Sequence, residues 1–577
     1  MRLKILSLII LSVFIILGTC LFYNQILKGG YFYQLSENNR IRLVPEDAAR
    51  GVIFDAKRRP LVDSTLSYYL VASPQVLKNK KEKARTLDKL SLVLGMSLYQ
   101  LEAVYKKNYT APFADIVLMK DIPRELIFKI EQMNLDLPAV SIKPKPQRRY
   151  VLKEAGAQVF GFLGEIDKAQ LTQLTQYGYR RQDLIGKSGL ENSQDLILRG
   201  EEGGMQIEVN NRNHQVGILS SKAPVNGTDI QLTIDADLEA FAYEQLKGRR
   251  GAVVLMDPND GRILAMVSSP SFDPNMFISG SDSDQKIRSV LSDKDTPLVN
   301  RAIQNQYPPG SIFKIVTTAA GLETKRISES ATVFYCPGFY MLGGRRFNCA
   351  ETKGHGRVNL RDAIKKSCNV FFFKASEKIG QAPLSYYTNL LGFGKGTGVE
   401  LSGEVKGLVP DKSWKRRVMS DNWYDGDTLN FSIGQGYVLI SPIQAAVLIS
   451  AIANNGKLVQ PYLIESIGGA KIKRPLPRQL PISLRTIDII KDALYSVVES
   501  DEGTGVNARV GGLSVSGKTG TAQVTGRISH GWFVGYAPSE NPKVAIAVFV
   551  ENGGYGGEVA APIAGAVFKK MKQLGMF

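Results

Sequence analysis

The chain has 577 residues, a formal net charge of +18 and a hydrophobic content of 44%. A chain of this length exceeds what one hydrophobic core supports, so we expect two or more domains. The basic residues are dispersed and no nucleic-acid-binding motif is present, which excludes nucleic acid as a partner. The charge indicates either a solvated basic surface or attraction to anionic lipid headgroups or to a phosphate-bearing partner. The three histidines lie in no H-E-x-x-H motif and in no surroundings typical of a Ser-His-Asp triad.

The N-terminal segment is apolar and long enough to cross a bilayer. Arg2 and Lys4 precede residues 5–27, which carry no charge over 23 positions. The two positive charges predict an N-terminus in the cytoplasm and the rest of the chain outside. A cleaved signal peptide is the alternative, because the residues before Cys20 weakly resemble a lipoprotein cleavage site. We expect a cytoplasmic tail and an uncleaved single-pass anchor over residues 1–27.

The following segment, residues 28–229, contains no credible set of catalytic side chains. Residues 50–55 alternate in the manner of a strand. Residues 74–145 alternate lysine-rich helical patterns with short apolar runs and are predicted to form an inserted subdomain. Residues 203–225 are polar and rich in turn formers. We expect this half of the chain to act as a spacer and to contact partners.

Residues 230–577 are predicted to form a second domain of the α+β class. Residues 251–255 and 262–268 are apolar strands separated by a turn, which indicates a hairpin. A long helical block follows over about residues 300–500, and further strands begin near Leu513, Gly531 and Val544. Strands at both ends with helices between them predict one antiparallel sheet flanked by helices.

A turn followed by an apolar helix places Ser311 near a helix start. Residues 308–310, Pro-Pro-Gly, cannot lie inside a helix, whereas residues 312–322 have the pattern of a buried helix. Lys314 lies one turn beyond Ser311 on the same face. A lysine whose pKa is lowered can accept a serine proton, and a helix N-terminus favours an oxyanion.

S-x-x-K by itself is a weak signal. Ser283-x-x-Lys286 has the same spacing without a Pro-Gly turn before it, and Ser311 alone would more often be a helix N-cap. Two downstream motifs change this interpretation, namely Ser367-Cys368-Asn369 and Lys518-Thr519-Gly520. Ser420-Asp421-Asn422 is an alternative second motif, but it lies among charged and turn residues. Ser367 instead follows a helical pattern and precedes a run of apolar residues.

The order S-x-x-K, S-x-N, K-T-G resembles that of the penicillin-recognising serine enzymes. Residues 50–55 (R-G-x-I-x-D) and 186–191 (G-x-x-G-L-E) extend the likeness over nearly the whole chain. The chain is therefore similar to class B penicillin-binding proteins, most of all to penicillin-binding protein 2 of cell elongation. In that family Arg-Asn-Gly usually follows residue 55. Here the sequence is Ala-Lys-Arg, so a different turn is expected.

The resemblance implies an α+β fold. It comprises a penicillin-binding transpeptidase domain, with a five-stranded antiparallel sheet flanked by helices, over residues 230–577. An elongated α+β pedestal or dimerisation domain precedes it over residues 28–229, with a head inserted at about residues 74–145. One transmembrane helix would hold the protein in the cytoplasmic membrane, with the catalytic domain in the periplasm.

The resemblance also implies acyl transfer without a cofactor. Ser311 would attack the carbonyl between the last two D-alanines of a peptidoglycan stem peptide. Lys314 would accept the serine proton, its pKa lowered by burial and by the nearby cation Lys518. Ser367 would relay a proton to the leaving D-alanine, and Asn369 would hold the amide of the donor. A β-lactam mimics the same amide and would acylate the serine.

The third motif would bind the substrate. Lys518, Thr519 and Thr521 would bind the terminal carboxylate, and Gly520 would let the backbone approach the ligand closely. The N–H groups of Ser311 and Thr521 would form the oxyanion hole.

A metal site is a separate hypothesis. Cys336, Cys349, His355 and Cys368 have a spacing that fits no common zinc finger, yet three cysteines and a histidine suffice for tetrahedral Zn²⁺. Some proteins similar to penicillin-binding protein 2 carry a zinc near the second motif. Such a zinc would fix the wall of the cleft and affect catalysis only indirectly. The alternatives are a Cys336–Cys349 disulfide and free thiols.

Two other functions are weighed against the transpeptidase. A D,D-carboxypeptidase or β-lactamase would let water resolve the acyl-enzyme, but no E-x-x-x-N stretch offers a deacylating glutamate, since Glu377 lacks the asparagine. A non-enzymatic β-lactam receptor would need an output domain, which a four-residue cytoplasmic tail does not supply. Since no polymerase domain is recognised, we also expect a SEDS-type membrane glycan polymerase of the elongation complex as a partner, beside stem peptides, β-lactams and the membrane.

Overall fold

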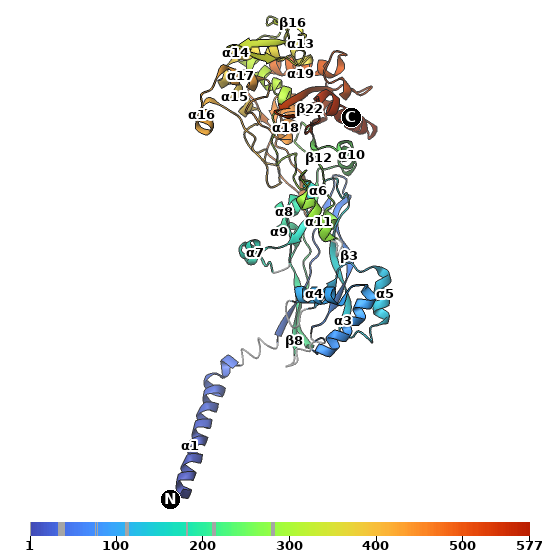
Figure 1. Cartoon of the computed structure of the whole chain (residues 1–577), viewed down its shortest axis with the longest axis vertical. Helices are drawn as coiled ribbons and strands as arrows, with labels where there is room; N and C mark the ends of the chain where they lie inside the picture. Colours follow the sequence, from blue (N-terminus) through green and yellow to red (C-terminus); the bar gives the residue numbers. More distant parts are fainter. Residues whose placement is uncertain are drawn as a thin grey trace. The chain divides into compact units, whose positions relative to one another are not determined.

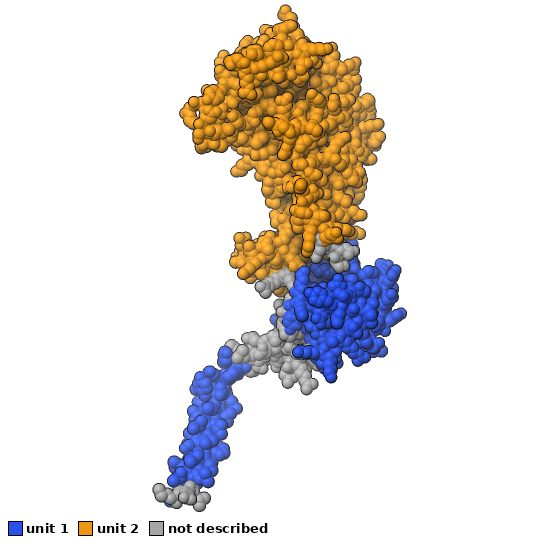
Figure 2. All heavy atoms as spheres, viewed as in Figure 1, with its two compact units in different colours: residues 1–50, 64–147, 199–227 blue, residues 51–63, 148–198, 228–577 orange. Residues whose placement is uncertain are grey.

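The computed structural model describes most of the chain, and the described residues form two compact units (Figure 2). The described ranges are residues 2–32, 41–74, 77, 79–109, 115–180, 183–209, 215–278 and 283–577. Unit 1 comprises residues 1–50, 64–147 and 199–227, and unit 2 comprises residues 51–63, 148–198 and 228–577. Each unit gathers separate stretches of chain. The continuous domains expected from the sequence, divided near residue 230, therefore stay a prediction.

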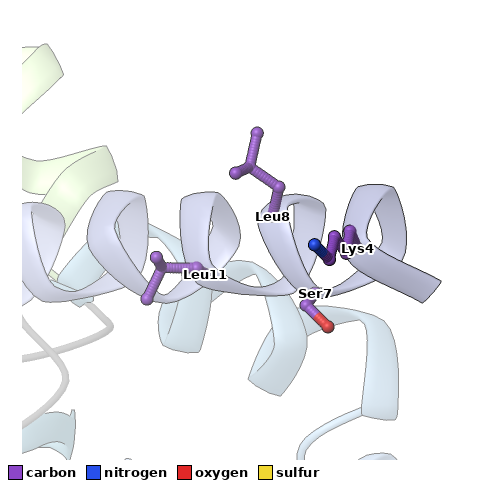
Figure 3. A pocket seen from close by; sticks show the side chains of 4 residues that line it. All are labelled: Lys4, Ser7, Leu8 and Leu11. Carbon is purple, nitrogen blue, oxygen red and sulfur yellow. The ribbon is translucent and has the colours of Figure 1, made fainter. Parts of the chain in front are cut away.

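Unit 1 begins with the apolar helix expected from the sequence. The helix α1 covers Arg2–Phe22 and continues as the π-helical turn η1, Tyr23–Leu27. Its apolar side chains are exposed, and the stretch Lys4–Leu27 is long and apolar enough to cross a membrane. Figure 3 shows the side chain of Lys4 near the start of this helix, followed by Ser7, Leu8 and Leu11. Such a helix has no protein core to cover it, so its surface suits lipid.

The rest of unit 1 is built from two small assemblies. Three antiparallel strands form one sheet in the order β1, β8, β9, which cover Ile41–Glu46, Gly203–Val209 and Gln215–Lys222. The other holds three helices and the strand β4, namely α3 (Lys80–Leu94), α4 (Leu98–Asn108), α5 (Arg124–Gln132) and β4 (Ile116–Met119). The Asn79 side chain caps α3, and Ser97 with Gln100 forms a capping box on α4. Leu87, Leu90 and Leu101 are fully buried in their shared core.

Two longer strands run through both units. β3 covers Pro60–Ala72 and β5 covers Val140–Tyr150, and within unit 1 β3 pairs with β4. In unit 2 four neighbouring strands of a sheet have the order β19 (Ala470–Lys471), β18 (Ile464–Ile467), β10 (Ile230–Leu232) and β2 (Ile53–Phe54). The remaining elements of this part of unit 2 are α6 (Ala157–Phe160), β6 (Leu163–Glu165), α7 (Lys168–Leu174), η3 (Thr175–Tyr177), β7 (Leu184–Gly186), α8 (Gly189–Ser193) and α9 (Asp195–Arg199).

A buried ion pair joins the two sequence elements typical of the family's non-catalytic half. Arg148 Nε donates to Glu191 Oε1 at 2.7 Å, and the two side chains are 1% and 0% exposed. Arg148 Nη1 also donates to the carbonyl of Gly51 at 2.7 Å. Glu191 belongs to the G-x-x-G-L-E element and Gly51 to R-G-x-I-x-D, so one guanidinium ties both together. Removing one member of such a pair costs about 3–5 kcal/mol, because the other charge stays buried.

The turn after residue 55 differs from the family sequence but keeps a tight geometry. Asp55 accepts hydrogen bonds from the N–H groups of Lys57 and Arg59 and from Arg59 Nε, at 2.7–2.8 Å. Arg58 has φ +60°, a left-handed conformation that glycine adopts most easily. It stands where the family usually has the glycine of Arg-Asn-Gly, so the hydrogen bonds to Asp55 hold a conformation that the residue itself disfavours.

The centre of unit 2 is a five-stranded antiparallel sheet, as expected. Its strands have the order β12 (Ile263–Ser269), β11 (Gly251–Met256), β23 (Val544–Val550), β22 (Arg527–Ala537) and β21 (Ser516–Val524). The expected hairpin is β11–β12. The strand expected near Leu513 begins at Ser516, and the one expected near Gly531 begins at Arg527.

The central strand β23 is apolar at every position because the sheet is covered on both sides. Ala545, Ala547 and Phe549 belong to one hydrophobic core, whereas Val544, Ile546, Val548 and Val550 belong to the other. Side chains of a strand alternate between its faces, so a sheet buried on both faces requires continuous apolar residues. One core includes α18 (Pro442–Ala453), and the other includes α10 (Ala236–Leu246) and α21 (Ala561–Gln573).

The helical part of unit 2 packs against the edge strand β21 through α19 (Leu484–Glu499) (Figure 1). Its other helices are α12 (Lys314–Glu323), α13 (Leu360–Lys365), α14 (Asn369–Ile379), α15 (Gln381–Leu390), α16 (Lys412–Met419) and α17 (Asp425–Ser432). The short strands are β13 (Phe334–Cys336), β14 (Phe339–Leu342), β15 (Arg345–Asn348), β16 (Gly356–Val358), β17 (Lys457–Leu458) and β20 (Arg478–Gln479). The remaining helical elements are η4 (Pro274–Phe277), α11 (Ser283–Ser292), η5 (Gly310–Phe313), η6 (Val506–Ala508) and α20 (Gly556–Val559).

Candidate active site

Ser311 lies in a short 3₁₀ turn rather than at the first position of a regular helix. The turn η5 leads directly into α12, which begins at Lys314. Gly310, just before the serine, has φ +56°, and its N–H donates to the carbonyl of Gly434 at 2.9 Å. Glycine adopts this left-handed conformation most easily, which fits the Pro-Gly sequence before the serine.

Two glycines let the serine turn lie directly against the edge strand β21. A Cβ atom on Gly310 would lie 2.7 Å from the carbonyl oxygen of Thr521, and one on Gly520 would lie 3.0 Å from that of Pro309. The contact at Gly310 is shorter than real Cβ atoms make with backbone, so this position excludes larger residues, whereas the contact at Gly520 is tight and would require its neighbour to shift. Trp532 Nε1 donates to the carbonyl of Pro308 at 3.0 Å and fixes the turn from the next strand.

Lys314 is fully buried and points into the second motif. Its Nζ donates to the carbonyl of Ser367 at 2.7 Å, to Ser367 Oγ at 3.2 Å and to Asn369 Oδ1 at 2.7 Å. Its hydrogen bonds therefore run to Ser367 and Asn369, and not to Ser311. Burial lowers the pKa of Lys314 to about 8, because a charged amine is costly away from water, while the nearby thiols of Cys368 and Cys349 act in the opposite direction.

Ser367 occupies the junction between α13 and α14 in a left-handed conformation, with φ +54°. This conformation costs a residue other than glycine about 1–2 kcal/mol, and such strain is concentrated at functional sites. The N–H of Ser367 donates to the carbonyl of Ile364 at 3.2 Å, and that of Cys368 to the carbonyl of Ala363 at 2.8 Å. The bent backbone turns both the carbonyl and the hydroxyl of Ser367 toward Lys314.

Lys518 approaches the same hydroxyl from the opposite side. It is fully buried on β21, and its Nζ donates to Ser367 Oγ at 3.0 Å and to the carbonyl of Thr519 at 2.9 Å. Burial and the positive charge of Lys314 hold the pKa of Lys518 well below its usual value. The sequence predicted that burial and the charge of Lys518 together would lower the pKa of Lys314. In the structure burial is the main cause for both amines, and the charge effect falls on Lys518.

The third motif lies on the free edge of the sheet, since β21 pairs only with β22 among the described strands. Thr519 Oγ1 lies 2.7 Å from Thr504 Oγ1, so a second hydroxyl stands behind the predicted substrate-binding one. Thr521 Oγ1 accepts a hydrogen bond from the N–H of Gly556 at 3.4 Å. Thr504 was not foreseen. Its only signal in the sequence is the Gly-Thr-Gly turn that follows α19.

The two competing motifs lie outside this arrangement. Ser420 follows the last residue of α16 with φ +54°, and the neighbouring Asp421 pairs with the buried amine of Lys415 at 3.0 Å. The S-D-N triplet therefore has a structural role at a helix end. Ser283 begins α11, and its side chain lies outside the described part of the chain.

The predicted metal ligands do gather in one place. The ligand atoms of Cys336, Cys349, His355 and Cys368 all lie within 4.8 Å of one another, and the cysteines are free thiols. His355 Nδ1 lies 3.6 Å from the sulfur of Cys336 and 3.5 Å from the sulfur of Cys349. The sulfurs of Cys349 and Cys368 lie 4.0 Å apart. Ligands of a tetrahedral zinc at about 2.3 Å are about 3.8 Å apart, so the four residues fit the ion.

The thiols of Cys349 and Cys368 are electrostatically coupled, and their pKa values shift in opposite directions. Hydrogen bonds from Cys368 and His355 lower the pKa of the Cys349 thiol. The hydrogen bond between the two cysteines raises the pKa of the Cys368 thiol. The N–H of Asn369 donates to the sulfur of Cys349 at 3.3 Å, so the cluster touches the second motif directly. A thiolate is the form that binds a metal.

Comparisons with known proteins agree with this geometry. Residues 251–569 match the model of the penicillin binding protein transpeptidase domain, and residues 45–232 match that of the penicillin-binding protein dimerisation domain. The peptidoglycan D,D-transpeptidase MrdA of Acinetobacter baumannii is 34% identical over 571 residues, which cover 95% of this chain and 84% of the relative. MrdA of Escherichia coli is 31% identical over 578 residues, which cover 95% and 90%.

Solved structures show the same likeness. The complex between penicillin-binding protein PBP2 and MreC from Helicobacter pylori superposes with a TM-score of 0.83 at 28% identity, covering 93% of this chain and 100% of that chain. PBP2 of Pseudomonas aeruginosa in complex with WCK 5153 gives a TM-score of 0.70 at 29% identity, covering 91% and 96%. These relatives favour cross-linking over the hydrolase and receptor alternatives. The three motifs, the two matched domains and the relatives above 30% identity together show that the chain belongs to the penicillin-binding protein 2 family of peptidoglycan D,D-transpeptidases, the β-lactam-binding enzymes of cell elongation.

Proposed function

We propose that Ser311 carries the acyl group and that Lys314, Ser367 and Lys518 move the protons of the reaction. The observation that carries the proposal is the meeting of three motifs at one atom, since Lys314 Nζ and Lys518 Nζ lie 3.2 and 3.0 Å from Ser367 Oγ. No other pair of lysines is fully buried around a hydroxyl in the described residues.

The first half of the reaction is acylation. Ser311 Oγ attacks the carbonyl carbon of the D-Ala–D-Ala bond, and neutral Lys314 accepts its proton. The new C–O bond gives a tetrahedral intermediate, whose collapse breaks the C–N bond. The departing amine takes a proton from Ser367 Oγ, which is replaced from the protonated Lys314. D-alanine leaves, and the donor peptide remains as an ester on Ser311.

In the second half the amine of another stem peptide attacks this ester. The proton of this amine passes through Ser367 and Lys314 back to Ser311 Oγ. The ester bond to Ser311 breaks as the amide cross-link forms. The N–H groups of Ser311 and Thr521 are the proposed oxyanion hole, since Gly310 brings the serine turn against Thr521. Asn369 would hold the amide of the donor.

The hydroxyls of Thr519 and Thr521 and the amine of Lys518 are proposed to bind the terminal carboxylate of the donor. The edge position of β21 supports this role, because an edge strand leaves backbone groups available to a ligand. Gly520 keeps that strand close to the serine turn. A β-lactam presents a carboxylate and a strained amide in the same relation and is proposed to acylate Ser311.

We also propose that α1 anchors the protein in the cytoplasmic membrane as a single pass. Arg2 lies before the span and Lys4 at its first position, which favours a cytoplasmic N-terminus and a periplasmic catalytic domain. One similar solved structure, with a TM-score of 0.74 at 29% identity and covering 98% of this chain and 97% of that chain, shows a peptidoglycan synthase complex that coordinates polymerization and crosslinking. By analogy, this chain is proposed to work with a SEDS-type membrane glycan polymerase of the elongation complex.

The cysteine cluster is proposed to hold a structural Zn²⁺. Cys336, Cys349, His355 and Cys368 would supply a complete set of four ligands, and a closed site of this kind stabilises a fold rather than supplying a reactive position. Cys368 lies between Ser367 and Asn369, so the ion would hold the second motif in place. Catalysis itself needs no cofactor in this proposal.

Penicillin treatment of the full-length protein is expected to add one penicilloyl group, on the tryptic peptide that contains Ser311. Mass spectrometry of the intact protein and of its peptides measures this. Ser311→Ala should abolish the adduct, whereas Ser283→Ala removes the serine of the competing S-x-x-K and should leave it unchanged. An adduct on any other residue would contradict the assignment of the nucleophile.

The rate of acylation by a β-lactam is expected to rise with pH. Lys314 must be neutral to accept the proton, and its pKa of about 8 leaves it largely protonated below pH 7. The second-order rate constant should therefore rise about tenfold per pH unit up to about pH 7.5 and level off above about pH 9. Stopped-flow measurement with a chromogenic cephalosporin tests this. A rate constant that stays flat between pH 6 and 9 would argue against lysine as the base.

Purified protein is expected to contain about one zinc ion per chain, measured by inductively coupled plasma mass spectrometry together with a count of alkylatable thiols. Cys336→Ser should lower the zinc content, whereas Cys20→Ser, which changes the cysteine of the membrane helix, should not. Less than half an equivalent of zinc would refute the metal site. A missing pair of alkylatable thiols in the unreduced protein would instead indicate the disulfide.

Affinity purification from detergent-solubilised membranes is expected to recover a membrane glycan polymerase with the full-length protein, identified by its peptides. Replacing residues 2–27 by an unrelated transmembrane helix keeps the protein in the membrane and should reduce recovery of the polymerase at least several-fold if the anchor contributes to the contact. Equal recovery would place the contact in the periplasmic part, and no recovery with either protein would contradict the partnership.

A further inference from the structure

A small hairpin beside the active site has one face packed and one face open. β14 and β15 are joined by Gly343 and Gly344, whose φ values of +54° and +77° suit a two-residue hairpin turn. On one face Tyr340 and Phe347 contact Phe373 of α14, with ring centroids 6.4 and 5.8 Å apart. Because neighbouring residues of a strand point to opposite faces, the open face that points away from α14 carries Phe339, Met341, Arg346 and Asn348.

The open face leads to the second motif through Asn348. The backbone carbonyl of Asn348 accepts a hydrogen bond from Asn369 Nδ2 at 3.2 Å. The Oδ1 atom of Asn369 accepts one from Lys314 Nζ at 2.7 Å. The end of the hairpin is therefore one side chain away from the buried amine. The next residue, Cys349, receives the N–H of Asn369 on its sulfur and holds this end of the hairpin against the site.

Arg346 stands on the same open face in a fixed orientation. Its Nε donates to Asn348 Oδ1 at 2.9 Å, and its guanidinium lies 4.1 Å from the centroid of the Phe339 ring. These two contacts orient the guanidinium plane and occupy only one of its three nitrogens. The side chain is exposed, and no carboxylate of the described residues forms an ion pair with it. An oriented guanidinium with two free nitrogens is the geometry that binds a carboxylate with two hydrogen bonds.

We propose that Arg346 binds a carboxylate of a peptidoglycan stem peptide beside the second motif, and that Asn348 is the residue that positions it. The inference rests on the transpeptidase function proposed above and adds a specificity-determining contact to it. Both reacting peptides can bring a carboxylate, the donor next to the amide that Asn369 holds and the acceptor next to its amine. The chemistry of the subsite is the same for either source.

The test compares the full-length wild-type protein with Arg346→Gln, Arg346→Lys and Asn348→Ala in two arms. In the donor arm, acylation of Ser311 is measured with a stem-peptide thioester whose side-chain carboxylate is free or amidated. In the acceptor arm, the donor is amidated, and transfer is measured to an amine that carries or lacks a neighbouring carboxylate. Arg345→Gln is the matched control, because it removes the same charge from the same strand but from the face that bears Phe347.

For one of the two arms, Arg346→Gln is expected to lower kcat/KM for the carboxylate-bearing peptide about tenfold, mainly through KM, and to leave the amidated peptide within twofold. The arm affected identifies the source of the carboxylate. Arg346→Lys should recover part of the loss, since it keeps the charge but not the paired hydrogen bonds. Asn348→Ala should reduce the preference for the free carboxylate by a smaller factor, and Arg345→Gln should change nothing.

Equal losses for free and amidated peptides in both arms, or no loss in either, would overturn the subsite. Acylation by benzylpenicillin, which has no stem-peptide side chain, reports separately on the active site. A variant that loses this reaction as well has been damaged structurally, and that outcome counts against a specific role for the residue changed. Failure of the wild-type protein to react with both benzylpenicillin and the donor would contradict the proposed nucleophile, and the subsite with it.

Discussion

Two buried amines on either side of one hydroxyl are the constraint on which the active site depends. Lys314 and Lys518 are both inaccessible to water, and both donate to Ser367 Oγ. Two ammonium groups this close in a dry site cannot both be charged without a large cost, so burial makes a neutral amine available near neutral pH. An exposed lysine would stay protonated and would be useless as a base. In the proposed mechanism, this neutral amine takes the role that an imidazole has in other serine enzymes.

Bringing the two amines together requires close contact between elements that are far apart in the chain. Lys314 comes from the start of a helix, Ser367 from a strained junction between two helices and Lys518 from the edge of the sheet. Gly310 and Gly520 allow the helix start to lie against the edge strand, because a side chain at Gly310 would collide with the backbone of Thr521 and one at Gly520 would be crowded by the carbonyl of Pro309. The sheet is rigid enough to set these distances because both of its faces are buried.

The second motif is supported on its outer side by the cysteine cluster. Asn369 donates its backbone N–H to Cys349 and its side-chain amide to Asn348, while its oxygen accepts from Lys314. One asparagine thus connects the buried amine, the proposed metal site and the hairpin that carries Arg346. A zinc ion in the cluster would stiffen this connection without touching the reacting atoms, and the hairpin would extend the binding surface from the reacting bond to the peptide around it.

Local sequence determined the apolar N-terminal span, the α+β class, the all-apolar central strand and the three motifs in order, because each depends on residues close together in the chain. It also favoured Ser367 over Ser420 as the second motif, and the structure places Ser420 at the end of a helix. It did not indicate the left-handed conformation of Ser367 or the contact of Thr504 with Thr519. It also assigned the lowered pKa of Lys314 partly to a neighbouring charge, where burial is the main cause. Burial and the pairing of distant side chains are properties of the packed chain. Tertiary structure alone therefore decided how Ser367 is held between the lysines and how far burial lowers the pKa of both amines.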